Sequence, residues 1–372
     1  MHLDKKALVK YFPEAALITG LLCWLIFAFT ARIGVTDSGM ISTLNVAFFI
    51  AVGLMTASAL ACLWTGRIGF TAYLATFTIL FALYSLPWMI SGTPFFIYSY
   101  RVLGYTNFIV DFGTYAPTSF PYQNWPGVML VGTFLKLNTG MTSLYALYIF
   151  PIIARTIQIL AVALLVKALT QDKRMALLAV LVYGMLDWTP YYMFEPQAMG
   201  MIFLLLIIWL IAVRGADNQL KFGYVALFVA FICTLVMSHV LSTFYCLAVI
   251  FILYLIEKRP FARGWMQRRT TLTFGMTLLP LVVFMTYVFY ANWDYLIRAL
   301  PGILKSLGNL AYIFGGGSVG GSGETGYAGV VMIKIVFMIV LAIVGLIAFL
   351  YAWKKFGIRN NFKIYFPLVC LI

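Results

Sequence analysis

Long apolar runs alternate with short polar or basic segments along most of this chain. An apolar run of about 20 residues is long enough to cross a bilayer as a helix. Such runs lie near residues 13–31, 40–63, 70–90, 143–169, 271–290 and 330–353. Another begins after residue 363 and is incomplete at Ile372. The pattern predicts an all-α, polytopic transmembrane helix bundle, and we expect the chain to be truncated within its last span.

Two further apolar stretches, 175–213 and 223–256, carry polar residues in their middles and basic residues on both flanks. A stretch whose two flanks lie on the same side must cross the membrane an even number of times. We therefore expect two hairpins, with the crown of the first at 187–197 and with Ser238 and His239 near the outer end of the second. The halves of the second are short, so one kinked helix is the alternative there. About 11 spans result, in a single transmembrane domain covering 1–372.

Two long segments interrupt this pattern. The first, 91–142, contains YSYRVLGYTNFIVDFGTYAPTSFPYQNWPG, followed by an apolar stretch at 128–140 that is short for a span and that we expect to be an interfacial helix. The second, 291–329, is rich in glycine but lacks the GK[ST] ending of a phosphate-binding loop. We expect a flexible linker there, with a lid over substrate as the alternative.

Charge indicates which side each segment faces. Most of the 25 lysines and arginines lie in the short turns between spans and at the N-terminus. The positive-inside rule then predicts a cytoplasmic N-terminus, two external long loops and a multi-pass protein of the plasma membrane. The net charge of +14 does not indicate a nucleic-acid partner, because the basic residues are dispersed between apolar spans. The chain is 63% hydrophobic and 10% charged, which excludes a soluble domain.

The same topology gathers Asp111, Asp187, Glu195 and His239 at the outer membrane boundary. Asp111 follows Phe108 and precedes Phe112 and Tyr115, and an aspartate shielded by these rings would have a raised pKa suited to a general base. An Asx-turn or helix cap is the alternative for Asp111.

Asp187 and Glu195 could bind an acceptor or a divalent metal ion, or they could cap helix ends. His239 could carry a proton or bind a ligand, or it could hydrogen-bond a backbone carbonyl. The chain has only two histidines, so we expect no histidine-based metal site.

Several cations have similar alternatives. Arg101, Arg298 and Lys305 could hold a phosphate at the headgroup level, although interfacial snorkelling also explains such residues. Arg155 lies near the middle of its span, so we expect it to face the interior of the bundle and to form an ion pair.

Three short segments carry a resemblance to a known family: the loop with Asp111, Tyr115 and a WPG turn at 125–127, the EPQAMG segment at 195–200, and SHVLS at 238–242. The chain resembles the GT-C superfamily of membrane glycosyltransferases. The resemblance implies transfer of a sugar from a polyprenyl-phosphate donor to an acceptor at the outer face, with Asp111 as the base. Glu195 and His239, from the same outer boundary, are further catalytic candidates. The substrate-binding candidates are Arg101, Tyr115, Trp125, Asp187, Gln197, Arg298 and Lys305.

Two other functions fit the same pattern. A transporter or flippase for a lipid-linked or amphiphilic substrate would carry charged or broken helices near the midplane. A non-catalytic assembly subunit would tolerate replacement of all the outer polar residues. A lateral cavity holding the outer polar residues favours transfer, whereas a pore through the midplane favours transport.

Overall fold

The computed structural model describes residues 5–31, 44–91, 97–115, 121–186, 194–214, 222–258, 272–294 and 297. These residues are mostly helical and include no strand, which confirms the all-α prediction. Contacts divide the chain into two compact units. The first comprises Met1–Ala116 and Trp125–Ser242, and the second comprises Pro117–Asn124 and Thr243–Ile372.

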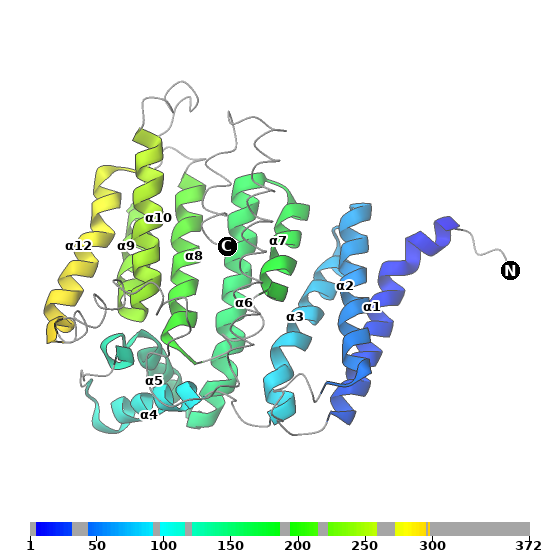
Figure 1. Cartoon of the computed structure of the whole chain (residues 1–372), viewed down its shortest axis with the longest axis horizontal. Coiled ribbons are helices and arrows are strands. Elements are labelled where there is room, and N and C mark those ends of the chain that lie inside the picture. The colour runs from blue at the N-terminus through cyan, green and yellow to red at the C-terminus, as the bar shows by residue number, and fades with distance from the viewer. Residues whose placement is uncertain are drawn as a thin grey trace, which may run out of the picture. The chain divides into compact units, whose positions relative to one another are not determined.

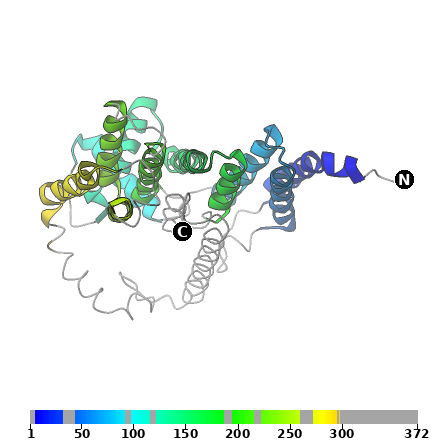
Figure 2. The same cartoon turned by 90° about the horizontal axis from the view of Figure 1, so that it is seen from above.

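Seven helices of the first unit match predicted spans and hairpin halves. They pack in a row in which α3 meets α7, α7 meets α6, α6 meets α8 and α8 meets α9 (Figures 1 and 2). Their bounds are α1 (Lys5–Thr30), α2 (Val46–Thr65), α3 (Phe70–Ser91), α6 (Ser143–Thr170), α7 (Lys173–Leu186), α8 (Pro196–Arg214) and α9 (Phe222–Ser238). The predicted hairpin at 175–213 is thus two helices, α7 and α8, which pack on α6.

The composition of these helices suits lipid. Among the described residues, five helices are long and apolar enough to cross a membrane: α1, α2, α6, α8 and α12 (Phe274–Ala291). Aromatic side chains such as Phe29, Trp64 and Phe70 lie at helix ends and are almost fully exposed, as residues of an interfacial belt are. The protein is therefore a multi-pass membrane protein.

Local signals set the helix ends. Asn45 caps α2 by accepting a hydrogen bond from the backbone N–H of Phe48, at 3.2 Å. Gly66 then ends α2 with φ of +73°, a left-handed conformation that glycine adopts without strain. Its position allows the tight turn that leads directly into α3.

The helix ends of the first unit segregate by charge. The start of α1, the α2–α3 turn, the α6–α7 turn and the end of α8 all lie on one side of the row (Figure 1). Each of these four places carries lysine or arginine in the sequence. We call this side the basic end of the bundle.

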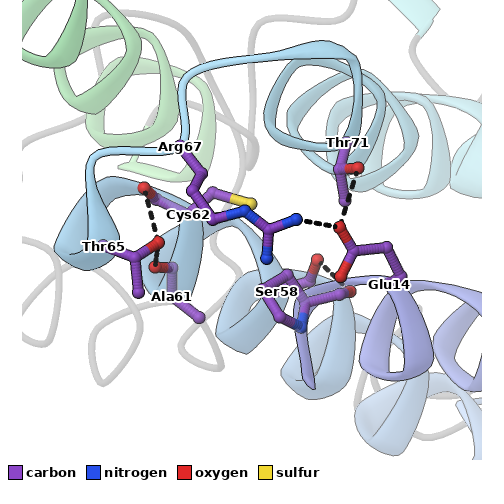
Figure 3. A network of polar contacts seen from close by, with 8 residues as sticks. Glu14, Ser58, Ala61, Cys62, Thr65, Arg67 and Thr71 are labelled. Atoms are coloured by element: carbon purple, nitrogen blue, oxygen red, sulfur yellow. Dashed lines mark hydrogen bonds and ion pairs between the residues drawn. The ribbon is translucent and has the colours of Figure 1, made fainter. Parts of the chain in front are cut away.

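A polar network at the basic end joins α1, α2 and α3 (Figure 3). Arg67 forms an ion pair with Glu14 at 2.8 Å, and the Thr71 hydroxyl donates to the same carboxylate at 3.5 Å. The buried Ser58 hydroxyl donates to the carbonyl of Pro13 at 2.6 Å. Because the ion pair is partly exposed, it adds only about 0–1 kcal/mol, and its main effect is to fix the position of the α2–α3 turn.

The opposite side of the row carries two helices within the segment predicted as the first external loop. They are α4 (Ile97–Phe112), which lies across the direction of α6, and α5 (Gly127–Thr139) (Figure 1). The helix expected at 128–140 is α5, and its interfacial position stays a prediction. The segment is more ordered than a loop, because α4 forms a helix that the sequence analysis did not anticipate.

The second unit includes a 3₁₀ turn, η2 (Pro121–Asn124), most of α10 (Val240–Lys258) and α12. The Tyr287 hydroxyl donates to the carbonyl of Asn124 at 2.7 Å, which attaches the turn to α12. Phe244 of α10 packs edge-on against Phe284 of α12. The predicted span at 330–353, the glycine-rich segment and the last partial span lie outside the described residues.

Candidate functional site

The three segments that carry the family resemblance meet in the first unit. Gly127 of the WPG turn lies against Ser238, and Gly200 of EPQAMG lies against His239 and Ser242. The start of α5, the start of α8 and the end of α9 therefore converge on one region. We call this region the outer junction; it lies on the side of the row opposite the basic end.

Both glycines are needed for this close approach. A Cβ atom at Gly127 would lie 2.7 Å from the Ser238 hydroxyl, and one at Gly200 would lie 2.7 Å from the Cβ of His239. Real Cβ atoms are essentially never that close to other heavy atoms. The absence of a side chain at these two positions is what lets the helices approach so closely.

Glu195 directly precedes α8 and is 8% exposed. Burial raises the pKa of its carboxyl group to about 7, because a charged carboxylate is poorly solvated there. Gly200, which touches His239, lies five residues further along, or about 7.5 Å of helix rise. Glu195 thus lies less than two helical turns along the chain from the residue of α8 that packs against His239.

His239 separates α9 from α10 and is half-buried. Its Nδ1 atom accepts a hydrogen bond from the backbone N–H of Ser242 at 3.2 Å and lies 2.9 Å from the Ser242 hydroxyl. An Nδ1 that accepts from a backbone N–H carries no proton, so the ring proton is on Nε2. Burial lowers the pKa of His239 to about 4, which keeps the ring neutral at pH 7.

Asp111 lies in the last turn of α4 and is exposed. The buried face of α4 consists of Ser99, Val102, Leu103 and Thr106, spaced as one helical stripe. Asp111 is about 130° around the helix from that stripe. The expected shielding by aromatic rings is therefore wrong, since the side chain is on the outward face.

The structure also does not support the alternative for Asp111, an Asx-turn or a helix cap. A carboxylate favours the N-terminus of a helix, whereas Asp111 is at the C-terminal end of α4, where the helix dipole is negative. The helix is ended instead by Gly113, with φ of +63°. Within the part of the chain that is described, the Asp111 carboxylate also makes no hydrogen bond. Its role as a base stays a prediction.

A second close contact connects α4 to the loop that carries Glu195. A Cβ atom at Gly132 of α5 would lie 2.5 Å from the Phe194 ring and 3.0 Å from a methyl carbon of Thr106. Phe194 is fully buried and packs edge-on against Phe150 of α6. Phe194 thus holds the backbone next to Glu195 against α5 and α6.

The remaining predicted residues are distributed unevenly. Trp125 is buried at the start of the WPG turn, and Gln197 is half-buried in the first turn of α8, so both belong to the outer junction. Tyr115 is half-buried and Arg101 is exposed on α4. Asp187, Arg298 and Lys305 lie outside the described residues. Within the ranges the structure covers, no three His, Cys, Asp or Glu side chains are grouped as metal ligands.

Arg155 faces the interior as expected, but its described partners are neutral. Its guanidinium donates to the hydroxyls of Tyr84 and Tyr183, each at 3.1 Å, and to the amide oxygen of Gln158. It also lies 4.8 Å from the centre of the Tyr183 ring, within cation–π range. Gln158 in turn donates to the carbonyl of Ala198, so this network connects α3, α6, α7 and α8.

Gly127, Gly200 and Ser242 are parts of the site that the sequence patterns did not predict. Their signal was present in the quoted segments, since each segment contains a small residue within three positions of a candidate residue. Small residues allow close helix packing in membranes, so the two glycines could have been interpreted as contact points.

Comparison with known proteins gives no match for this chain among protein families, curated proteins or solved structures.

Proposed function

We propose that this protein is a membrane glycosyltransferase that moves a sugar from a polyprenyl-phosphate donor to an acceptor at the membrane face bordered by α4 and α5. The observation that carries the proposal is the convergence of WPG, EPQAMG and SHVLS at the outer junction. These are the segments on which the resemblance to GT-C enzymes rests, and they are far apart in the sequence. The donor's tail requires lipid and its headgroup requires water, so the reaction belongs at such a boundary.

Glu195 suits the role of general base. The base removes a proton from the acceptor hydroxyl while the hydroxyl oxygen forms a bond to the anomeric carbon of the sugar. The bond from that carbon to the phosphate oxygen breaks, and the lipid phosphate leaves with the electron pair. A base works best when its pKa is near the operating pH, and the pKa of Glu195 is about 7.

His239 and Asp111 have different roles in this proposal. The neutral His239 can donate a hydrogen bond from Nε2 to a phosphate oxygen of the leaving group. Asp111 is solvated on the outward face of α4, where it can bind an acceptor hydroxyl or act as the base in place of Glu195. Arg101 on the same helix supplies a positive charge for the donor phosphate.

Two conservative substitutions test the roles of the carboxylates. Sugar transfer in membranes is measured for Glu195→Gln, Asp111→Asn and the control Asp172→Asn, which is at the basic end. An asparagine can still cap α7, so the control should retain full activity. We expect transfer to fall by at least 100-fold in Glu195→Gln and by less in Asp111→Asn, because general base catalysis contributes about 10²–10⁴-fold.

The opposite ranking would make Asp111 the base. Full activity in both variants would contradict the proposed site. A transporter is the competing function, and it would be favoured if vesicles containing the protein moved a lipid-linked sugar across the bilayer without forming a covalent product.

A further inference from the structure

A groove lies between α3, α6 and α7, within the first unit and away from the outer junction. Its volume is about 520 Å³, which is within the usual range for small-molecule sites. The side chains along it are mostly apolar, including Phe77, Phe81, Leu160, Ala163 and Leu164. It lies where α3 and α6 each pack on α7, and Arg155 of α6 contacts Tyr84 of α3 directly.

The groove is long and opens sideways. Its α3 wall extends from Tyr73 to Ser85, which corresponds to about 18 Å of helix. One leaflet of a bilayer has a hydrocarbon depth of about 15 Å, half of the whole core. Phe77, Leu160 and Leu164 line the groove and are also strongly exposed, so the groove is open on the face that meets lipid.

Charge is confined to the two ends of the groove. Lys167 and Lys173 line it at the basic end, and both are exposed. Within the described part of the chain, neither ammonium group forms an ion pair or hydrogen bond. Asp172 lies between them in sequence, but one of its carboxylate oxygens already accepts a hydrogen bond from the backbone N–H of Arg174.

The other end of the groove is lined by polar groups that already have hydrogen-bond partners. Arg155 lines it there, with its guanidinium held by Tyr84, Tyr183 and Gln158. No acidic side chain is among the described residues that line the groove. An apolar channel of one leaflet's depth with two lysines at its mouth is complementary to a single chain that ends in an anion.

We propose that this groove binds an anionic phospholipid of the leaflet bordering the basic end, with one acyl chain between α3 and α6 and the phosphate at Lys167 and Lys173. The phosphate is bound by two flexible lysine ammonium groups rather than by the rigid, planar guanidinium group of an arginine. Binding therefore selects for negative charge more than for headgroup shape. The site is separate from the proposed transferase site and does not depend on it.

The experiment is native mass spectrometry of the full chain, released from nanodiscs that contain phosphatidylglycerol or phosphatidylcholine. We expect a one-lipid adduct with phosphatidylglycerol and a much weaker one with phosphatidylcholine. The double variant Lys167→Gln/Lys173→Gln should lower the apparent phosphatidylglycerol affinity by about thirtyfold, since each lysine near an anionic lipid surface contributes about a fivefold factor. The double variant Lys6→Gln/Lys10→Gln removes the same charge from α1, outside the groove, and should leave the adduct unchanged.

A third variant tests the position of the acyl chain. Ala163→Phe places a ring in the groove without changing charge, and we expect it to reduce the same adduct. An equal loss in the two lysine double variants would overturn the proposal in favour of general surface attraction. If Ala163→Phe retains the adduct, the groove is not the binding site. If an added polyprenyl phosphate binds more tightly than phosphatidylglycerol does, the occupant is not a phospholipid.

Discussion

At the scale of single residues, the buried carboxyl group of Glu195 connects proton binding to stability. Its pKa is raised from 4.5 to about 7 in the folded protein, so the folded state holds the proton more tightly than the unfolded state. A group of this kind contributes full stability below pH 4.5, and that contribution is lost as the pH rises through 7. A pKa difference of this size corresponds to about 3 kcal/mol of stability at pH 8.

The substitution Glu195→Gln should therefore stabilise the protein in alkaline solution. Its amide cannot ionise, so the thermal midpoint of the purified variant should exceed that of the unaltered protein at pH 8 and equal it at pH 5. Differential scanning fluorimetry across this pH range is the measurement. A gap between the two proteins that does not change with pH would show that burial of the charge is not what raises the pKa.

The exposure of the Asp111 side chain was predicted wrongly from the sequence, although the sequence contained the pattern that determines it. Its aromatic neighbours in sequence suggested a shielded carboxylate, but shielding depends on which face of α4 is buried. The stripe of Ser99, Val102, Leu103 and Thr106 could have given that face in advance, because its spacing is helical. Treating the stretch as a loop hid the helical periodicity.

At the scale of elements, the contact between α8 and the α9–α10 break depends on Gly200. A methyl group there would push against the Cβ of His239 and the hydroxyl of Ser242. We expect Gly200→Ala to destabilise the protein by about 1–3 kcal/mol through overpacking and to reduce sugar transfer, as judged by thermal midpoint and activity in membranes.

Gly53→Ala is the matched control for this substitution. Gly53 also lies within an apolar helix, α2, but a Cβ atom there would meet nothing within 4 Å. Its stability should be unchanged or slightly higher, since alanine is the better helix former. Equal behaviour of the two alanine variants would mean that close packing at Gly200 is not needed.

Most of the elements could be predicted from hydrophobic runs alone. The spans near 13–31, 70–90 and 143–169 correspond to α1, α3 and α6. The basic flanks of 175–213 also predicted two helices there, α7 and α8, because flanks on one side of the membrane require an even number of crossings. What the runs could not give is which helices are neighbours: α7, for example, packs between α3 and α6. Such contacts depend on side-chain shape and on residues far apart in sequence.

At the scale of the whole molecule, the segregation of charge within the first unit predicts opposite exposure of two turns. Gly69 lies in the α2–α3 turn at the basic end, and Asn138 lies near the end of α5; both are exposed. A membrane-impermeant maleimide applied to intact cells should label Asn138→Cys and should label Gly69→Cys only after the cells are permeabilised. The positive-inside rule gives this direction.

The unaltered protein provides the baseline for this labelling, since it has cysteines of its own. Labelling of both variants from the same side would contradict the proposed topology. Labelling with the two sides exchanged would keep the fold but place α4 and α5 in the cytoplasm.

The break at His239 has a mechanical consequence. Its Nδ1 lone pair caps the first turn of α10 by accepting from the Ser242 backbone. When the imidazole takes up a proton near pH 4, that lone pair is lost and the backbone N–H of Ser242 loses its acceptor. Acidification therefore adds a charge at His239 and also removes the cap of α10. The first turn of α10 should then fray at Ser242, the residue that packs closely against Gly200.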